Sequence, residues 1–305
     1  GIADDLVTTT VMACQTPVLV CPSMNTEMLQ NPLVQDNIAA LGAMARYTLL
    51  DPSAGELACG VVGPGRLPDP PHIIEAIGRV LGPRDLDGVR VTITAGPTRE
   101  AVDPVRFLTN HSTGTMGFAL ARACVTRGAE VTLIAGPVTL ATPPGIARRV
   151  DIPTAADVAA AVDAAWETTD VLFMAAAVAD YRPAEVAGQK LKKRPGDLSL
   201  DLVRTTDVLE STARLPGRDQ KVVVGFAAET EHLEANAREK LEAKGLCAIV
   251  ANDVSAPDAG FGRGDNAGLL VTRRGVTPLA RAPKVAFAAT ILDVLAPVIR
   301  ARLDD

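Results

Sequence analysis

Aromatic side chains are scarce in this 305-residue sequence, at 3% of all residues with one Trp and two Tyr. Few aromatic rings are therefore present to stack on nucleobases, and the net charge of −6 gives no overall attraction to a polyanion. These two features argue against a nucleic-acid partner. Because hydrophobic residues still make up 48% of the chain, Ala, Val and Leu must fill its core.

Cysteine, histidine and long apolar runs are also limited. The five cysteines are odd in number and lack Cys-x-x-Cys spacing, which favours a reducing cytoplasm over a disulfide framework. No apolar run reaches the roughly 20 residues that cross a bilayer, and Gly-Ile-Ala-Asp-Asp-Leu does not begin a signal peptide. His72, His111 and His232 are scattered and indicate no metal site. The sequence predicts a cytoplasmic protein without a membrane partner.

Two domains are expected because residues 82–88, Gly-Pro-Arg-Asp-Leu-Asp-Gly, are typical of a linker. The first domain, residues 1–83, should contain helices near 1–13, 31–41 and 71–81, a strand at 17–21 and a Gly/Pro-rich loop at 55–66. In the second domain, residues 84–305, short apolar runs alternate with helical patterns. Strands are expected at 89–94, 130–135, 171–175, 221–226, 248–251 and near 268–272, and helices at 116–127, 155–166, 231–244 and 284–300. This order predicts an α/β fold with a doubly wound, mostly parallel sheet.

A ligand site is expected where the strand at 171–175 ends. Small residues follow the strand, then Asp180 and Tyr181, and a lysine-rich loop begins at Lys190. Ligands of open α/β sheets bind at the carboxyl ends of strands, so this loop could cover an anion. The alternative is a core strand followed by a solvated loop. Residues 112–117, with hydroxyls and glycines before a helix, form a second candidate anion site.

Two motifs in the first domain resemble those of flavin-dependent phosphopantothenoylcysteine decarboxylases. They are Pro-Ser-Met-Asn-x-x-Met, at 22–28, and Leu-Ala-Cys-Gly-x-x-Gly-x-Gly-Arg, at 57–66. The resemblance implies FMN as cofactor, Asn25 as a substrate-binding residue, and Cys59 on a mobile flap as proton donor; the alternative for Cys59 is a small buried residue. The family's catalytic histidine and first flavin-phosphate loop have no counterpart, and Leu29 replaces Trp or Tyr. The N-terminal part of this domain is therefore expected to be missing, which leaves decarboxylation by this chain uncertain.

A longer series of motifs follows in the second domain. It comprises Gly-Pro-Thr-Arg-Glu (96–100), Asp-Pro-Val-Arg-Phe-x-x-Asn-His-Ser-x-Gly (103–114), Ala-Ala-Val-Ala-Asp-Tyr (176–181), Lys-x-Lys-Lys (190–193), Val-Gly-Phe-Ala-Ala-Glu-Thr (224–230) and Ala-Asn-Asp-Val-Ser (251–255). In this order they resemble phosphopantothenate–cysteine ligase, the second half of the bifunctional coenzyme A biosynthesis proteins. The resemblance implies ligation of 4′-phosphopantothenate to cysteine through an acyl-cytidylate, with CTP and Mg²⁺. It also implies a homodimer through the ligase domain, and a higher homo-oligomer where the decarboxylase domain is intact.

Site residues follow from the same resemblance. Lys190 would neutralise charge on the triphosphate and the reacting phosphoryl group, and Asn110 would hold the acyl-cytidylate for the cysteine step. The implied nucleotide-binding residues are Met174, Ala175, Ala176, Asp180, Lys190, Thr206, Asp207, Val208, Leu209, Phe226, Lys240 and Lys244. The implied substrate-binding residues are Arg106 from a second subunit, Asn110, Ala176, Ala177 and Asp180. Their alternatives are a solvated helix face for Lys240 and Lys244, core packing for Phe226, and a turn or cap for Asn110.

Two departures from the ligase pattern are visible. Ser112-Thr113-Gly114-Thr115 replaces Ser-Ser-Gly-Lys, which removes a positive charge, and Thr205-Thr206-Asp207 replaces Asn-Pro-Asp but keeps the acid. A non-catalytic nucleotide-binding or regulatory module is the alternative function, although such a module would not need Lys190, Asn110 and Asp180 together. An NAD(P)-linked oxidoreductase is disfavoured because Gly-x-Gly-x-x-Gly is absent.

Overall fold

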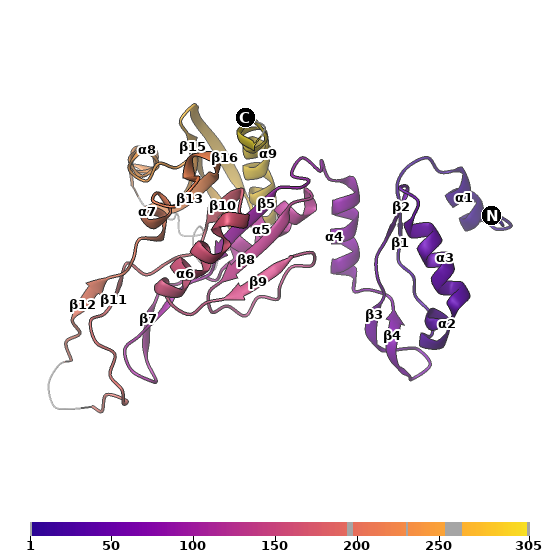
Figure 1. Cartoon of the computed structure of the whole chain (residues 1–305), viewed down its shortest axis with the longest axis horizontal. Helices are drawn as coiled ribbons and strands as arrows, with labels where there is room; N and C mark the ends of the chain where they lie inside the picture. Colours follow the sequence, from indigo (N-terminus) through magenta and orange to yellow (C-terminus); the bar gives the residue numbers. More distant parts are fainter. Residues whose placement is uncertain (1, 194–197, 230, 254–263, 304–305) are drawn as a thin grey trace. The chain divides into compact units, whose positions relative to one another are not determined.

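The computed structural model describes residues 2–193, 198–229, 231–253 and 264–303. The chain folds as two compact units, Gly1–Pro83 and Arg84–Asp305 (Figure 1). Over the described ranges, no helix combines the length and the apolar character required to span a membrane.

Unit 1 pairs a small parallel sheet with a hairpin. Its elements are α1 (Leu6–Ala13), β1 (Val18–Val20), α2 (Thr26–Gln30), α3 (Pro32–Gly42), β2 (Tyr47–Leu49), β3 (Ser53–Glu56), β4 (Val62–Arg66) and α4 (Pro70–Leu81). Strands β1 and β2 are parallel, and β3 and β4 form an antiparallel hairpin. The prediction of a loop at 55–66 is therefore wrong, because most of this segment belongs to the hairpin. Its glycines allow the backbone to approach neighbouring backbone closely. At Gly65, with φ of +128°, a Cβ would lie 2.1 Å from the carbonyl oxygen of Met24.

Unit 2 is built on an eight-stranded sheet in the order β16-β15-β14-β13-β10-β5-β8-β9. The six strands from β14 to β9 are parallel to their neighbours, and β15 and β16 are added antiparallel. The strands are β5 (Arg90–Ala95), β8 (Glu130–Ala135), β9 (Arg148–Asp151), β10 (Val171–Met174), β13 (Val222–Glu229), β14 (Ala248–Asp253), β15 (Asp265–Thr272) and β16 (Gly275–Pro283). The predicted doubly wound, mostly parallel sheet is confirmed. The two edge strands β9 and β16 were not predicted.

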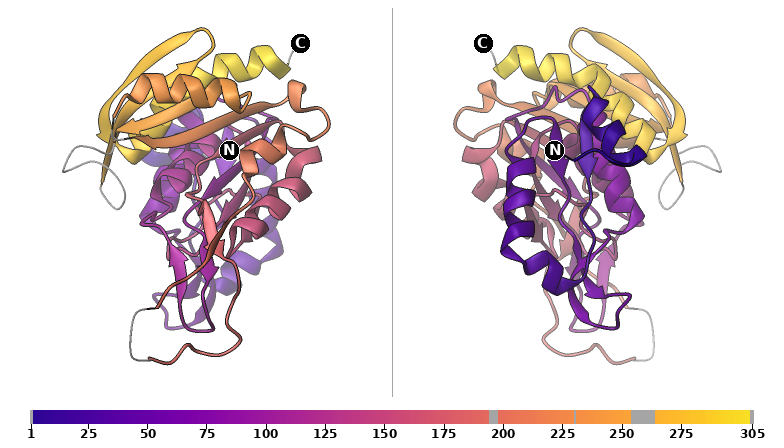
Figure 2. Two further views of the ribbon diagram at one scale, coloured as in Figure 1. Left: turned by 90° about the vertical axis from the view of Figure 1, so that its left-hand side faces the viewer. Right: turned by 90° about the vertical axis from the view of Figure 1, so that its right-hand side faces the viewer.

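Helices cover both faces of this sheet. The helices are α5 (Thr115–Thr126), α6 (Ala155–Ala165), α7 (Val208–Thr212), α8 (Leu233–Ala243) and α9 (Lys284–Leu303). Helices α5 and α9 enclose one core with Phe173, whereas α6, α7 and α8 enclose the other with Leu172. Figure 2 shows α9, in yellow, on the opposite face of the sheet from α8, in orange. Because neighbouring residues of β10 point into two different cores, this strand is apolar throughout.

The strand order places the ligand crevice. From β5 the chain moves outward to β8 and β9, then returns to β10 on the other side of β5 and continues to β13 and β14. The chain therefore adds strands on one side of the sheet after β5 and on the other side after β10. Open α/β sheets bind ligands at the carboxyl ends of the two strands where this change of direction occurs. Two antiparallel pairs also belong to unit 2: β6 (Arg99–Ala101) with β7 (Phe107–Thr109), and β11 (Tyr181–Pro183) with β12 (Leu202–Arg204).

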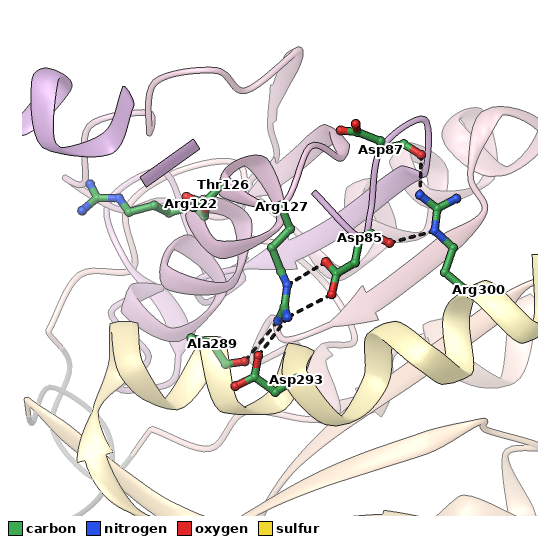
Figure 3. Close-up of polar contacts among 8 residues, drawn as sticks. All are labelled: Asp85, Asp87, Arg122, Thr126, Arg127, Ala289, Asp293 and Arg300. Atoms are coloured by element: carbon green, nitrogen blue, oxygen red, sulfur yellow. Dashed lines mark hydrogen bonds and ion pairs between the residues drawn. The ribbon is translucent and has the colours of Figure 1, made fainter. Parts of the chain in front are cut away.

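The first residues of unit 2 are fixed to α5 and α9 by two arginines (Figure 3). Arg127 donates to both carboxylate oxygens of Asp85, at 2.9 and 3.0 Å, and to Asp293 at 2.8 Å. Arg300 donates to the backbone carbonyls of Asp85 and Asp87, at 2.8 and 2.7 Å. Only 10% of the Arg127 side chain is exposed. Residues 85–87 are therefore held on the body of unit 2.

We expect Arg127→Met to lower the free energy of unfolding of unit 2 by about 1–3 kcal/mol, because it leaves carboxylates without their charged donor. Solvent around the partly exposed Asp85 and Asp293 limits the loss. Urea unfolding followed by fluorescence of Trp166, the sole tryptophan, measures this unit. Arg148→Met, at an exposed position, is the matched control. Equal midpoints for the two variants would contradict the expectation.

Candidate active site

A cavity of about 1130 Å³ opens where β10, β13 and β14 end and α5 begins. Single-ligand pockets are typically about 300–1,000 Å³, so this one has room for more than one substrate. Most of the predicted ligase-site residues line it. They are Asn110, Met174, Ala175, Ala176, Ala177, Asp180, Thr206, Asp207, Val208, Leu209, Phe226, Lys240 and Lys244. The motif residues Thr230, Val254 and Ser255 lie outside the described residues.

The alanine segment after β10 is tied to the loop after β5. The Ala176 N–H donates to the Thr94 hydroxyl at 3.1 Å, and the Ala177 N–H donates to the Gly96 carbonyl at 2.9 Å. Asn110 donates its side-chain amide to the Ala177 carbonyl at 2.5 Å. Small side chains and fixed backbone give this part of the cavity a defined shape. Asn110 thus also acts as a turn residue here, since its Oδ1 accepts from the Ser112 N–H.

The start of α5 is the predicted anion site at residues 112–117, and it lines the cavity. Gly114, the residue before the helix, has φ of +77° and gives no side-chain cap, so the first N–H groups of a 12-residue helix lack that partner. Thr115 occupies the position of the family's lysine, and its hydroxyl lies 2.7 Å from that of Thr113. This end of the cavity is therefore lined by backbone donors and hydroxyls of residues 112–115, where the family pattern has a lysine at position 115.

The two lysines of α8 and its C-cap are paired with carboxylates. Lys244 donates to Asp207 at 2.6 Å, and Lys240 donates to Glu229 at 2.5 Å. The hydrogen bond with Asp207 raises the pKa of Lys244. Burial opposes ionisation of Asp207, but hydrogen bonds from Lys244 and the Glu210 N–H outweigh it and lower the pKa of Asp207. Lys244 is therefore held as a cation at the cavity wall, and Lys240 is fixed there by its hydrogen bond to Glu229. Glu229, which sequence reasoning missed, lies in the Val-Gly-Phe-Ala-Ala-Glu-Thr motif.

Lys190 and Arg106 are the two predicted ligase-site residues that do not line the cavity. The buried Asp103 carboxylate accepts from Arg106 at 2.6 Å and from the Leu191 N–H at 3.0 Å, and Arg106 also donates to the Leu191 carbonyl. These bonds hold the lysine-rich segment against the β6–β7 pair. The exposed Lys190 therefore lies outside the residues that line the cavity of its own chain, and its role at the triphosphate stays a prediction.

A second pocket, of about 390 Å³, lies in unit 1 between the Ser23–Asn25 segment and the β3–β4 turn. Asn25 donates its amide to the Cys59 sulfur at 3.2 Å. Cys59 is exposed at this turn, so the alternative of a buried structural cysteine is wrong. A hydrogen bond from the Val61 backbone, followed by the one from Asn25, lowers the pKa of the Cys59 thiol. The site combines a thiol that ionises readily with a hydrogen-bonding amide.

We expect alkylation of Cys59 by iodoacetamide to reach half its maximal rate at a lower pH than an unperturbed thiol, because the thiolate is the reacting form. Replacing Asn25 by Ala should move that midpoint upward, since one thiolate-stabilising donor is lost. Peptide mass mapping across a pH series measures the rates. The buried Cys124, whose pKa is raised by burial, should stay unreactive in the folded chain and serves as the internal control. An unchanged midpoint in Asn25→Ala would contradict the assignment.

The fold and cavity define a doubly wound α/β protein with a polar crevice lined by cations. Sequence comparison identifies the family. Residues 86–298 match the model of the DNA/pantothenate metabolism flavoprotein C-terminal domain, and residues 1–82 match the flavoprotein model. The chain belongs to the family of the coenzyme A biosynthesis bifunctional protein CoaBC, which confirms the resemblance found in the sequence.

Individual relatives agree with this assignment. The chain is 47% identical over 269 residues to CoaBC of Bacillus subtilis, covering 87% of this chain and 66% of that protein. It is 43% identical over 297 residues to CoaBC of Vibrio cholerae, covering 97% and 74%. The crystal structure of a C-terminal domain of CoaBC superposes with a TM-score of 0.61 at 36% identity, covering 72% of this chain and 99% of that one.

Proposed function

We propose that unit 2 is a CTP-dependent phosphopantothenate–cysteine ligase. The observation that supports this most directly is the cavity after β10, where alanine backbone, the start of α5, and the paired cations Lys240 and Lys244 converge. Backbone N–H groups and ammonium groups suit phosphate oxygens, and a crevice of this size accommodates a nucleotide beside a second substrate. A passive regulatory module has no need of two ligands in one crevice.

In the first step, a carboxylate oxygen of 4′-phosphopantothenate attacks the α-phosphorus of CTP. The bond from that phosphorus to the bridging oxygen breaks, and pyrophosphate leaves with the electron pair. Positioning and charge neutralisation dominate such chemistry. Lys244 and Lys240 would exchange Asp207 and Glu229 for triphosphate oxygens. Mg²⁺ bound to the phosphates would neutralise further charge in this step.

In the second step, the cysteine amine attacks the acyl carbon of the cytidylate. The carbon–oxygen bond to CMP breaks, CMP leaves with the electron pair, and the nitrogen gives up a proton to water. Asn110 holds the Ala177 carbonyl, and with it the segment against which the acyl group lies. Asn110 therefore serves this step by positioning the intermediate.

A homodimer would complete the site. Arg106 and Lys190 lie outside the cavity of their own chain. Asp103 holds them near each other, because its carboxylate accepts hydrogen bonds from Arg106 and from Leu191, the residue after Lys190. We call the segment from Asp103 to Arg106, together with Lys190–Leu191, the arm. We infer that the arm acts at the cavity of a second copy, where Lys190 adds charge to the triphosphate and Arg106 contacts substrate. This arrangement gives a role to two basic residues that do not line the cavity of their own chain.

Unit 1 is proposed as the decarboxylase half. The flavoprotein match supports FMN, which supplies the redox chemistry when bound. Asn25 would hold the substrate, and Cys59 would return a proton from its sulfur to the enethiolate carbon. The small pocket has the thiol and amide that this role requires. Only these two roles are assigned to residues of unit 1.

Pyrophosphate release in the presence of CTP, 4′-phosphopantothenate and Mg²⁺ tests the ligase proposal. We expect release without cysteine in a single turnover, continued turnover with cysteine, and weaker activity with ATP or UTP. No release above the CTP-only background would refute it. Binding of CTP without release would identify the nucleotide-binding module instead.

A further inference from the structure

Three polar side chains with no role in the steps above line one wall of the unit 2 cavity. Asn252 comes from β14, Asn266 from β15 and Lys284 from the first position of α9. Asn266 and Lys284 are 7% and 6% exposed. Polar groups from three separate elements converge at this wall, which is typical of a binding site rather than of a solvated surface.

Asn252 has an unsatisfied acceptor. Its Oδ1 is buried, lies in a residue that lines the cavity, and has no hydrogen-bond partner among the described residues. Buried oxygen atoms without a partner are rare in folded proteins, and contact with water, an ion or another polar group is one explanation for them. A ligand at this position must present an N–H or O–H donor. Phosphate groups at neutral pH present mainly acceptors, so the triphosphate does not satisfy this atom.

Lys284 brings positive charge to the same wall. Its side chain is largely enclosed and lines the cavity. Lys284 is also the first residue of the 20-residue helix α9, and the aligned peptide dipoles at the start of a helix favour an anion. This wall therefore offers an acceptor for a donor group and a cation for an acidic group.

We propose that Asn252 and Lys284 form the subsite for the α-amino acid substrate, the Asn252 oxygen accepting from its amine and Lys284 binding its α-carboxylate. This inference rests on the proposed ligase function and identifies the part of the cavity in which cysteine binds. Among the three substrates, only cysteine carries an amine and a carboxylate on one carbon. Asn266, whose amide donates to the Met116 sulfur at 3.5 Å, borders the subsite.

The test compares cysteine with cysteamine, which has the same amine and thiol but no carboxylate. In the unaltered chain, kcat/KM for cysteine should exceed that for cysteamine by about 10–100-fold, the range expected for a charge-assisted contact. Lys284→Met should reduce this ratio to about threefold or less and leave cysteamine turnover within about threefold. Asn252→Leu should lower kcat/KM for both amines alike. Neither variant should change single-turnover pyrophosphate release, which precedes cysteine binding.

Arg274→Met removes an exposed cation outside the cavity and is the matched control for Lys284→Met. Lys284→Gln replaces Lys284→Met if thermal unfolding shows that the latter does not fold. An unchanged cysteine-to-cysteamine ratio, or an equal loss of pyrophosphate release, would overturn the subsite. Absence of pyrophosphate release from the unaltered chain would instead refute the ligase proposal, and the two failures are therefore distinguishable.

Discussion

Replacing Lys190 by Gln is expected to reduce pyrophosphate release about 100–1,000-fold, because the first step loses a positive charge aimed at the reacting phosphates. Asn110→Asp should still release pyrophosphate but form little ligated product, because a carboxylate in place of the amide repels the Ala177 carbonyl and displaces the bound acyl group. Quenched-flow measurement of pyrophosphate and of ligated product separates the two steps. Arg148→Gln, on the exposed edge strand β9, controls for loss of surface charge. Equal losses at both steps in both variants would contradict this division of roles.

Mixing two inactive variants decides whether Lys190 acts in its own chain or in its partner. In a mixture of Lys190→Gln and Lys244→Met chains, a mixed dimer pairs one intact cavity with an intact Lys190 from the other copy. Random exchange should then restore about a quarter of the wild-type sites. If Lys190 serves its own chain, the mixture stays inactive. Recovery of activity in the mixture would therefore support a site that combines the cavity of one copy with Lys190 of the other.

The second large effect is expected at Gly117, in the first turn of α5. A Cβ there would lie 2.5 Å from the Ala95 Cβ and 3.2 Å from the Thr94 carbonyl, so α5 could not stay in place on β5. Gly117→Ala should cost about 1–3 kcal/mol of stability. It should also lower ligase activity up to ~100-fold, because the start of α5 shifts within the cavity. Urea unfolding and pyrophosphate release measure the two effects.

A compensating change gives this prediction its control. Ala95→Gly removes the methyl group that collides, so Gly117→Ala combined with Ala95→Gly should recover part of both losses. Gly275→Ala adds the same methyl group where no atom lies within 4 Å of the new Cβ, and should leave both measurements near wild type. A double variant no better than Gly117→Ala would show that overpacking against β5 is not the cause.

The central strands of unit 2 could be predicted because each is buried on both faces. Val171–Met174 is apolar throughout for this reason, and its bounds agree with the expectation to within one residue. Strand β9, Arg-Arg-Val-Asp, and strand β16, with Gly, Pro and Arg, lie at the edges and carry polar side chains. Their sequences lack the apolar run by which an inner strand is identified.

The hairpins of the protein were missed for a related reason. The β3–β4 pair is rich in Gly and Pro, a composition that usually indicates a loop. Its pairing depends on close approach of Gly65 to Met24, a contact between residues 41 positions apart in the chain. No local pattern reports such a contact.

The sequence by itself determined the fold class and the family, and it named the side chains proposed to carry the chemistry. It could do so because the apolar runs of buried strands and the order of the motifs are both visible in short stretches of the chain. Only the tertiary structure decided which of those side chains share a cavity. Asp103 holds Arg106 and the segment after Lys190 away from it, while the ends of β14 and β15 and the start of α9 bring Asn252, Asn266 and Lys284 into it. Contacts between residues far apart in the chain place these groups, and such contacts form only when the sheet and its helices pack.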